Sequence, residues 1–478
     1  MSATVIKNLI GARWIHPSGP TLPVYNPALA EIIGEVPLSG SEAVGAAVEA
    51  ASRAFPGWAR TPLLQRVALM FRFKALLEDH AEDLAALITL HHGKTLEEAR
   101  GEVRRGIEVV DFACGAPTLL QGRTLREVSR GVDQDLYRYP IGVAAGIPPF
   151  NFPVMIPLWM FPLAVVAGNT FILKPSERTP LGAVRLAELF LEAGFPEGVL
   201  NVVHGAKEAV DALLAHPGVH AVSFVGSERV ARYVYSEAAR HGKRIQAAGG
   251  AKNHIVVMPD ADLDHTVPGI LNSAFGNAGE RCLAGSVTVA VGGIGGELLE
   301  RLEEETGALK VGPGDQPGVD VGPLIRDEHR QAIKTYIQRG VEEGARLLMG
   351  GEEPDRPGFF LAPAILDGVR APMTVARDEI FGPVLAVSYA KDLEEALAQT
   401  NASAYGNMAT IFTSSGAAAR AFRDRVEAGM VGVNVGVAQP FAFYPFSGWR
   451  ASFFGDLHLH GQDGIDFFTR KKMAITRW

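Results

Sequence analysis

The sequence has 478 residues, of which 47% are hydrophobic and 21% are charged, and its formal net charge is −8. This balance is typical of a soluble globular chain with two or three domains. The negative charge disfavours a nucleic-acid partner, because phosphate binding requires a basic surface. The chain has two cysteines, Cys114 and Cys282, which excludes a disulfide framework and favours a reducing compartment, so we expect a cytoplasmic protein. The residues after Met1 lack a basic stretch followed by a long apolar run, so no signal peptide is expected.

One long stretch, from Ile141 to Leu173, contains no charged residue. Its length exceeds the roughly 20 residues that a membrane-spanning helix needs. However, it contains five prolines, and a proline inside a helix removes a backbone hydrogen bond and clashes with the preceding turn. We therefore expect a buried strand, an irregular loop and a buried helix here, and no membrane span.

Apolar strands and amphipathic helices alternate between residues 170 and 248. Strands are predicted at 170–174, 199–204, 220–225 and 244–248, and helices at 181–192, 207–215 and 228–240. Continuous apolar strands separated by helices indicate a parallel sheet that is covered on both faces. A second α/β series is predicted, with strands at 254–258, 286–291, 410–413 and 431–435. Residues 124–139 are expected to form a β-hairpin whose edges need a partner, and residues 464–478 are expected to be extended.

Cys282 lies in the segment Gly276-Asn-Ala-Gly-Glu-Arg-Cys-Leu-Ala-Gly, between a predicted helix and a predicted strand. The glycines allow a tight, exposed backbone, and the neighbouring Arg281 would favour the thiolate over the thiol. A reactive nucleophile is one interpretation, and a small buried hydrophobic residue is the other. Cys114 lies in the apolar segment 109–120, where the buried interpretation is the better one.

Two strand ends carry residues that could bind a dinucleotide. Gly226 and Ser227 lie where a predicted strand leads into a helix, which suits a phosphate, although serine is also an ordinary N-cap. Lys174 and Glu177 follow another strand, where the Glu177 carboxylate could hold ribose hydroxyls or could be a solvated loop charge. The dinucleotide fingerprint with three spaced glycines is absent.

Most histidines are scattered, and His458 and His460 lie two residues apart near the C-terminus. No third ligand is apparent near them. We expect a surface loop at this pair rather than a metal site.

Several spaced motifs together resemble one family. They are Pro149-Phe-Asn-Phe-Pro153, Lys174-Pro-Ser-Glu-Arg-Thr-Pro180, Phe224-Val-Gly-Ser227, Gly249-Gly-Ala-Lys-Asn-His254, Gly279-Glu-Arg-Cys282, Glu379-Ile-Phe-Gly-Pro383 and Phe454-Gly-Asp-Leu-His-Leu-His-Gly461. In this order they resemble the aldehyde dehydrogenase superfamily over essentially the whole chain. Within that superfamily the chain is similar to the methylmalonate-semialdehyde dehydrogenases.

The resemblance implies an α/β fold with two parallel-sheet domains and a β-hairpin oligomerisation arm. The implied NAD-binding domain covers residues 1–118 and 141–248, and the catalytic domain covers residues 249–450. The implied arm covers residues 119–140 and 451–478. An arm of this kind suggests a homodimer or a homotetramer.

The resemblance also implies the residues of an NAD-dependent active site. Cys282 matches the family nucleophile, and Asn151 matches the amide that stabilises the oxyanion together with the backbone N–H of Cys282. Glu177 and Glu379 would hold the two riboses. The complete set implied to face the cofactor is Pro148, Phe150, Lys174, Glu177, Arg178, Ser227, Gly249, Glu379 and Phe381, with Ser227 at the pyrophosphate and Phe381 beside the nicotinamide.

One departure from the family pattern bears on the acyl acceptor. Hydrolytic members have a glutamate where this chain has Ala247, and without that base we expect coenzyme A to accept the acyl group rather than water. Glu280 is close in sequence and could substitute as the base. Arg105 and Arg281 are implied to bind a substrate carboxylate, although a surface salt bridge is the alternative for Arg105.

These residues predict the oxidation of methylmalonate or malonate semialdehyde through a cysteine thioester, with decarboxylation, to propionyl-CoA or acetyl-CoA. One alternative is an NAD-dependent enzyme that releases a free acid. A protein that keeps the fold without catalysis is the other alternative.

Overall fold

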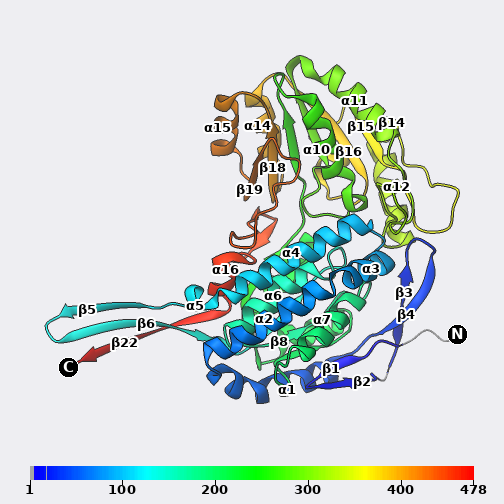
Figure 1. Ribbon diagram of the computed structural model, residues 1–478. Coiled ribbons are helices and arrows are strands. Elements are labelled where there is room, and N and C mark those ends of the chain that lie inside the picture. Colours follow the sequence, from blue (N-terminus) through cyan, green and yellow to red (C-terminus); the bar gives the residue numbers. More distant parts are fainter. Residues whose placement is uncertain (1–4, 18) are drawn as a thin grey trace.

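The computed structural model describes residues 5–17 and 19–478. Two mixed sheets and a long arm organise the chain, and in Figure 1 the second sheet lies above the first while the arm extends to the left. Two smaller sheets have two strands each. In one, β3 (Thr21–Asn26) pairs with β4 (Glu31–Pro37), and in the other, β17 (Tyr405–Gly406) pairs with β20 (Trp449–Arg450).

The first sheet has the strand order β2-β1-β9-β8-β7-β10-β11-β21. Its five central strands, which are β9, β8, β7, β10 and β11, are parallel. The strands at both ends of the sheet pair antiparallel. The strands are β1 (Asn8–Ile10), β2 (Arg13–Ile15), β7 (Val143–Ile147), β8 (Thr170–Leu173), β9 (Leu200–Val202), β10 (Val219–Val225), β11 (Arg244–Ala248) and β21 (Phe453–Phe454). The parallel sheet predicted between residues 170 and 248 is thereby confirmed. The sheet also contains β7 and the antiparallel strands at both ends, which lie outside that range of residues.

Helices cover both faces of this sheet, as its uninterrupted apolar strands require. One face packs against α2 (Leu63–Asp79), α3 (Ala81–His92), α4 (Leu96–Cys114), α6 (Met155–Val166) and α7 (Leu181–Glu192). The other face packs against α1 (Ser41–Arg60), α8 (Lys207–Ala215) and α9 (Glu228–Arg240). A short helix, α5 (Ala116–Leu119), leads from α4 to the arm.

The charge-free stretch folds as the sequence predicts, into β7, an irregular loop at 148–154, the buried helix α6 and β8. All residues of α6 are buried, and Pro162 lies inside the helix. Among the described residues, no helix is long and apolar enough to cross a membrane.

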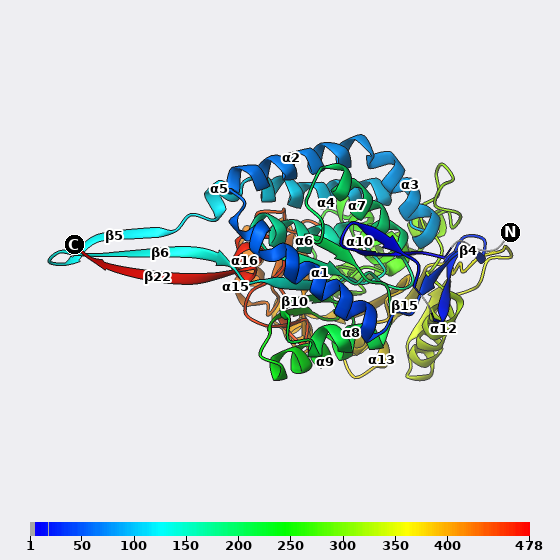
Figure 2. The same ribbon diagram turned by 90° about the horizontal axis from the view of Figure 1, so that it is seen from below.

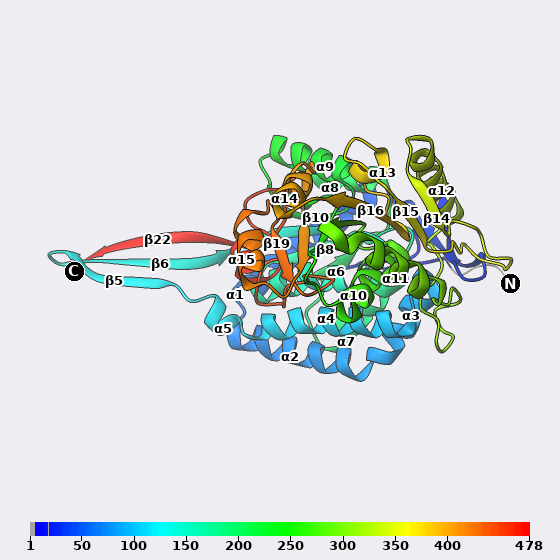
Figure 3. The ribbon, with the colours of Figure 1, turned by 90° about the horizontal axis from the view of Figure 1, so that it is seen from above.

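The second sheet has the strand order β14-β15-β16-β13-β12-β18-β19, and only β14 pairs antiparallel. Its strands are β12 (His254–Val257), β13 (Val287–Val291), β14 (Arg346–Met349), β15 (Ala364–Asp367), β16 (Val384–Ala390), β18 (Met408–Phe412) and β19 (Met430–Val433). Its helices are α10 (Leu263–Phe275), α11 (Gly295–Gly307), α12 (Asp327–Glu342), α13 (Thr374–Arg377), α14 (Leu393–Asn401) and α15 (Gly416–Arg425), with 3-10 turns at Gly276–Gly279 and Gly292–Ile294. In Figure 3, α10 and α11 lie side by side near the middle of the molecule.

The arm is a three-stranded antiparallel sheet of β5 (Arg123–Ser129), β6 (Val132–Pro140) and β22 (Thr469–Arg477). It projects far from the rest of the chain (Figure 2). The predicted hairpin is therefore confirmed, and β22 pairs along the whole length of β6.

The segment before β22 differs from the expectation in two ways. Residues 461–467 form a helix, α16 (Gly461–Phe467), so the prediction that 464–478 is extended is wrong for its first part. This helix packs on α6, where Gly464 lies close to Leu163 and Ile465 is fully buried. Strand β21 pairs with β11 of the first sheet, so residues 451–468 lie with that sheet, although the expected arm began at residue 451.

Candidate active site

Three loops meet at the edge between the two sheets. The loop after β7 carries Asn151, whose side-chain Nδ2 donates a 2.8 Å hydrogen bond to the carbonyl oxygen of Glu280, two residues before Cys282. The loop before β16 approaches the same segment, because a Cβ on Gly279 would lie 2.1 Å from the carbonyl oxygen of Gly382. Glycine is therefore required at position 279, where φ is also +72°. The structure thus brings Asn151 and the Cys282 loop together, as predicted.

The loop before Cys282 has an unusual backbone. Asn277, Ala278 and Gly279 all have positive φ, at 56°, 51° and 72°. Such φ values are uncommon for non-glycine residues and often occur at functional sites. Two contacts hold this conformation: Nδ2 of Asn277 donates to the Glu280 carbonyl at 2.7 Å, and the backbone N–H of Asn277 donates to Oε1 of Glu98 at 2.5 Å.

Two further asparagines hold the backbone of Cys282 itself. The Nδ2 atoms of Asn253 and Asn407 each donate to the Cys282 carbonyl oxygen at 2.9 Å. Asn253 belongs to a motif quoted above, but its contact was not predicted. Asn407 was missed entirely, because no spacing in the sequence relates a residue beside β18 to the nucleophile loop.

The surroundings of Cys282 raise the pKa of its thiol. Burial raises its pKa to about 12, and the Glu379 carboxylate also acts to raise it, whereas Arg281 acts to lower it. The expectation that Arg281 favours the thiolate has the right sign, but burial outweighs it. Cys114 is buried as expected, and burial raises its pKa to about 12 as well.

Glu379 contacts the segment that follows β11 and acts on the pKa of Cys282. Its Oε1 accepts a 3.0 Å hydrogen bond from the backbone N–H of Ala251, and its Oε2 would lie 2.6 Å from a Cβ on Gly250. Burial raises its pKa to about 7. A carboxyl group with this pKa can exist in either protonation state near neutrality.

Hydrolytic members of the family resembled here have a glutamate at the position of Ala247, and this position lies in the first sheet. Ala247 is fully buried in β11, where it pairs with Phe454 of β21. Glu280, the alternative base, is buried. The Oε1 of Glu280 accepts a 3.3 Å hydrogen bond from the Ile325 N–H, its two oxygens lie 3.7–3.8 Å from His329 and His92, and burial raises its pKa to about 8.

The two histidines near Glu280 each lie against a phenylalanine ring, His92 against Phe150 and His329 against Phe381. Phe150 and Phe381 meet edge to face with centroids 5.9 Å apart, and His92 stacks on Phe150 at 6.1 Å. Phe381 has φ of +58°, which is rare for a bulky residue, and Nε2 of His329 hydrogen bonds its carbonyl oxygen at 2.7 Å. Pro148 begins the same loop, two residues before Phe150.

The remaining predicted cofactor residues lie along the carboxyl ends of the first sheet. Lys174 is buried and its Nζ donates to the Gly205 carbonyl at 2.7 Å and lies 3.4 Å from Glu177. Burial acts to raise the pKa of Glu177, but Lys174 holds it below its usual value, so Glu177 is ionised. Ser227 is the N-cap residue directly before α9, and its hydroxyl makes no capping hydrogen bond and can accept another partner.

Two predicted positions border these residues. The backbone N–H of Gly249 donates to Ser452 at 2.8 Å, and a Cβ at Gly249 would lie 2.8 Å from the Ala451 carbonyl. Arg178 lines a small pocket of about 200 Å³ with Glu177, Ile325 and Arg326.

The two predicted substrate arginines have different surroundings. Arg105 on α4 is half-buried, lies 2.9 Å from Glu108, and its guanidinium lies 4.6 Å from the centre of the Phe441 ring. Arg281 is half-buried and reaches toward Gly276. Among the residues that the structure describes, no carboxylate forms an ion pair with Arg281.

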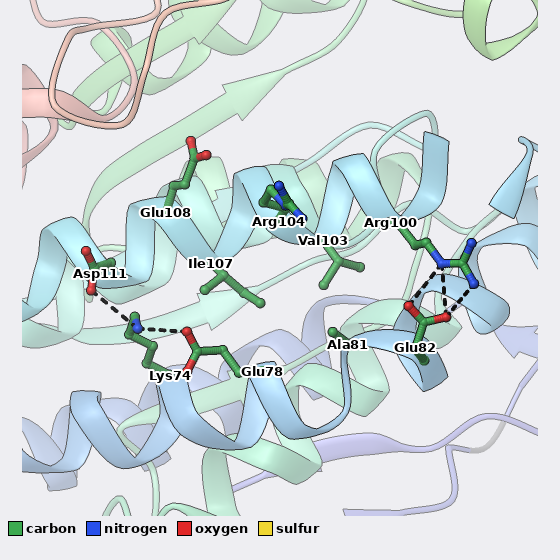
Figure 4. Close-up of a pocket in the computed structure, with 10 residues that line it drawn as sticks. All are labelled: Lys74, Glu78, Ala81, Glu82, Arg100, Val103, Arg104, Ile107, Glu108 and Asp111. Atoms are coloured by element: carbon green, nitrogen blue, oxygen red, sulfur yellow. Dashed lines mark hydrogen bonds and ion pairs between the residues drawn. The ribbon is translucent and has the colours of Figure 1, made fainter. Parts of the chain in front are cut away.

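A separate groove lies on the outer side of α4. It has a volume of about 450 Å³ and runs between α4 and the helices α2 and α3 (Figure 4). Its charged side chains largely pair with each other, as Arg100 does with Glu82 and Lys74 with Glu78. Arg104 lines this groove, whereas Arg105 does not.

The histidine pair near the C-terminus is partly buried rather than on a surface loop. His460 is buried and packs edge to face on Trp159 at 4.7 Å, so the surface prediction is wrong for it. His458 lies 3.3 Å from Asp463.

Comparisons with known proteins identify the family of this chain. The aldehyde dehydrogenase family model matches residues 14–474. Malonate-semialdehyde dehydrogenase 2 of Geobacillus kaustophilus is 53% identical over 477 residues, which cover 99% of both chains. The crystal structure of methylmalonate-semialdehyde dehydrogenase from Oceanimonas doudoroffii has a TM-score of 0.98 and 47% identity, covering 99% of this chain and 98% of that one. A putative methylmalonate-semialdehyde dehydrogenase from Sinorhizobium meliloti, complexed with NAD, has a TM-score of 0.98 and 44% identity, covering 100% and 99%. The chain belongs to the aldehyde dehydrogenase family.

Proposed function

We propose that this enzyme oxidises malonate semialdehyde or methylmalonate semialdehyde with NAD and transfers the decarboxylated acyl group from Cys282 to coenzyme A. The observation that carries the proposal is the combination of an intact nucleophile loop with Ala247 at the position of the hydrolytic base. The names of its relatives, at 53% and 51% identity, support this substrate class.

The residues present fit NAD as the cofactor. Glu177 offers an ionised carboxylate for ribose hydroxyls, and Ser227 offers a free hydroxyl at a helix N-terminus for a phosphate. Phe150 and Phe381 would flank the nicotinamide, and Glu379 would hold the second ribose. When bound there, NAD would supply the hydride acceptor.

In the acylation step, the Cys282 sulfur attacks the aldehyde carbon and its electron pair forms the C–S bond. The oxyanion then takes hydrogen bonds from a side-chain N–H of Asn151 and the backbone N–H of Cys282. When the C–H bond breaks, hydride leaves with its electron pair and a thioester on Cys282 remains. The thiol must first lose its proton to water, and the Glu379 carboxylate opposes this loss because it raises the thiol pKa.

The carboxylate of the substrate determines the next step. Arg105 and Arg281 would hold it through charge-assisted hydrogen bonds. The bond between the carboxylate carbon and the α-carbon then breaks, its electron pair enters the thioester enolate, and carbon dioxide leaves. The enolate takes up a proton, which leaves an acetyl or propionyl group on Cys282.

The final step is transfer to coenzyme A. Water needs a general base within hydrogen-bond reach to attack a thioester, and Ala247 supplies none. A thiol ionises without such help more readily than water, so coenzyme A is the better acceptor.

The arm supports a proposal about assembly. Leu125, Met473 and Ile475 expose 59–66% of their surface on this projecting sheet. We propose that the arm packs against a second copy in a homodimer or homotetramer, because a large exposed apolar face marks an interaction site. The two free cysteines fit a cytoplasmic enzyme.

Product analysis with and without coenzyme A tests the proposal. We expect acetyl-CoA from malonate semialdehyde and propionyl-CoA from methylmalonate semialdehyde, in equal amounts to the NADH formed. Equal turnover without coenzyme A, with a free acid as product, would support the hydrolytic alternative. Absence of NADH formation with every small aldehyde would support a protein that keeps the fold without catalysis.

A further inference from the structure

Lys94 is a buried cation beside the loop that carries Asn151. It directly follows the αL glycine that ends α3, and it is 2% exposed. Its Nζ donates to the backbone carbonyl oxygen of Asn151 at 2.7 Å and to Oε2 of Glu102 at 2.7 Å. The same ammonium lies 4.0 Å from the centre of the Phe152 ring. Lys94 therefore contacts two consecutive residues of the loop.

Glu102 on α4 holds the other end of the same loop. Its Oε1 accepts hydrogen bonds from the backbone N–H groups of Val154 at 2.8 Å and Met155 at 3.1 Å. These N–H groups belong to the start of α6, where backbone donors lack partners within the helix. Glu102 is 2% exposed, and both of its oxygens are thereby used.

Together the two side chains form a clamp, which we define as Lys94 and Glu102. The clamp fixes the backbone at Asn151 on one side and at Val154 and Met155 on the other. The Asn151 side chain is held from a third direction by the Glu280 carbonyl. The backbone of Asn151 is therefore fixed independently of the nucleophile loop that its amide must serve.

We infer that the Lys94–Glu102 clamp positions the Asn151 amide for stabilisation of the oxyanion on the substrate. Lys94 and Glu102 are positioning residues, because neither contacts Cys282 or the reacting atoms in the structure. This inference rests on the proposed function, in which Asn151 donates to the oxyanion.

The chemistry of the clamp favours a positioning role over simple packing. Burial of two charges costs desolvation energy, and well-packed apolar residues of similar size often stabilise a fold at least as well. Charged hydrogen bonds are short and directional, so they fix backbone atoms more tightly than apolar contacts do. Oxyanion stabilisation needs this accuracy, because donors act only when they are already aimed at the developing charge.

The clamp also links Asn151 to the predicted substrate arginine. Glu102 and Arg105 are three residues apart on α4, so they lie on neighbouring positions of one helix face. Gly106 allows α4 to approach α6 closely, since a Cβ there would lie 2.7 Å from Leu158. A shift of the clamp would therefore move both the oxyanion donor and the helix that carries Arg105.

The test uses the double variant Lys94→Met/Glu102→Leu, which removes both charges and leaves no unpaired ion buried. We expect kcat for NADH formation to fall by up to about 10²-fold, because a shift of about 1 Å in a reacting group can cost that much. The Kd of NAD, measured by fluorescence titration, should stay unchanged. The matched control is Arg100→Met/Glu82→Leu, which removes an exposed ion pair between α4 and α3 and should keep wild-type kcat.

A double-mutant comparison separates positioning from a structural role. In an Asn151→Ala background, the clamp variant should cause little further loss of kcat, because the group that it positions is already gone. A full additional loss there would overturn the inference. So would wild-type kcat in the clamp variant itself. If the double variant does not fold, Lys94→Arg is used, which keeps the charge but moves it; wild-type kcat in this variant would also overturn the inference.

Two outcomes distinguish this inference from the proposed function. If Asn151→Ala keeps wild-type kcat, the oxyanion role in the proposed function fails. If Asn151→Ala lowers kcat but the clamp variants do not, only the present inference fails.

Discussion

The side-chain amide of Asn151 donates a 2.8 Å hydrogen bond to the carbonyl oxygen of Glu280, two residues before Cys282. This bond joins the loop after β7 in the first sheet to the loop before β13 in the second sheet. Asn277 donates to the same oxygen at 2.7 Å, so this carbonyl has two amide donors. Asn151 retains a second N–H, which can serve the oxyanion.

Replacement of Asn151 by alanine tests this arrangement. We expect Asn151→Ala to lower kcat by roughly 10²–10³-fold, the usual cost of losing one oxyanion donor. The control is Asn277→Ala, which removes the other donor to the Glu280 carbonyl but no oxyanion donor, and should have a smaller effect. Steady-state NADH formation measures both. Equal losses in the two variants would mean that Asn151 acts only by holding the loop.

The role of Arg105 can be tested against its neighbour. Arg105→Leu should raise KM for malonate semialdehyde by roughly 10- to 100-fold, because a hydrogen bond to a charged group is worth about 1.5–3 kcal/mol. Propionaldehyde has no carboxylate, so its KM should stay the same. Arg104→Leu is the matched control, because Arg104 lines the outer groove of Figure 4. An equal rise in KM for both aldehydes would contradict the carboxylate role.

The reactivity of Cys282 toward iodoacetamide should follow the charges around it. Burial and Glu379 raise the thiol pKa and Arg281 lowers it, so little thiolate is present at pH 8. Glu379→Gln removes a negative charge, lowers the pKa and should speed alkylation without NAD. Arg281→Leu should slow it. Peptide mapping separates Cys282 from Cys114, and changes in the opposite directions would refute this account of the local charges.

The arm should control assembly. Ile475→Lys places a charge on the exposed apolar face of β22 and should shift the enzyme toward a smaller oligomer. Light scattering after size exclusion measures the mass, and thermal unfolding checks the fold. Lys471→Ala on the same strand is the control. An unchanged mass for Ile475→Lys would place the interface elsewhere.

The elements of the first sheet could be predicted closely from the sequence. The helices α7, α8 and α9 begin and end at the predicted residues, because each has an apolar face at helical spacing and lies between buried strands. Residues 464–467 were wrongly predicted as extended, because two glycines and alternating apolar residues obscured a short helix. Its formation depends on packing against α6, which no local pattern encodes.

In the site, too, some residues could be predicted from sequence motifs, whereas others depend on tertiary packing. Cys282 and Asn151 could be found from motifs that carry them, and the structure brings their loops together. Lys94 and Glu102 could not be found in this way, because their hydrogen bonds to residues 151–155 join positions that are 52–57 residues apart in the sequence. The raised pKa of the Cys282 thiol was also missed, because burial depends on tertiary packing rather than on the neighbouring Arg281.

The most direct test of the central claim is the mass of the intact protein after one turnover without coenzyme A. With NAD and methylmalonate semialdehyde, the account predicts a propionyl group on Cys282, without the carboxylate, and its removal as propionyl-CoA when coenzyme A is added. Cys282→Ser should show no such thioester. An unmodified Cys282 after full NADH release, or a free acid formed at the same rate without coenzyme A, would contradict the account.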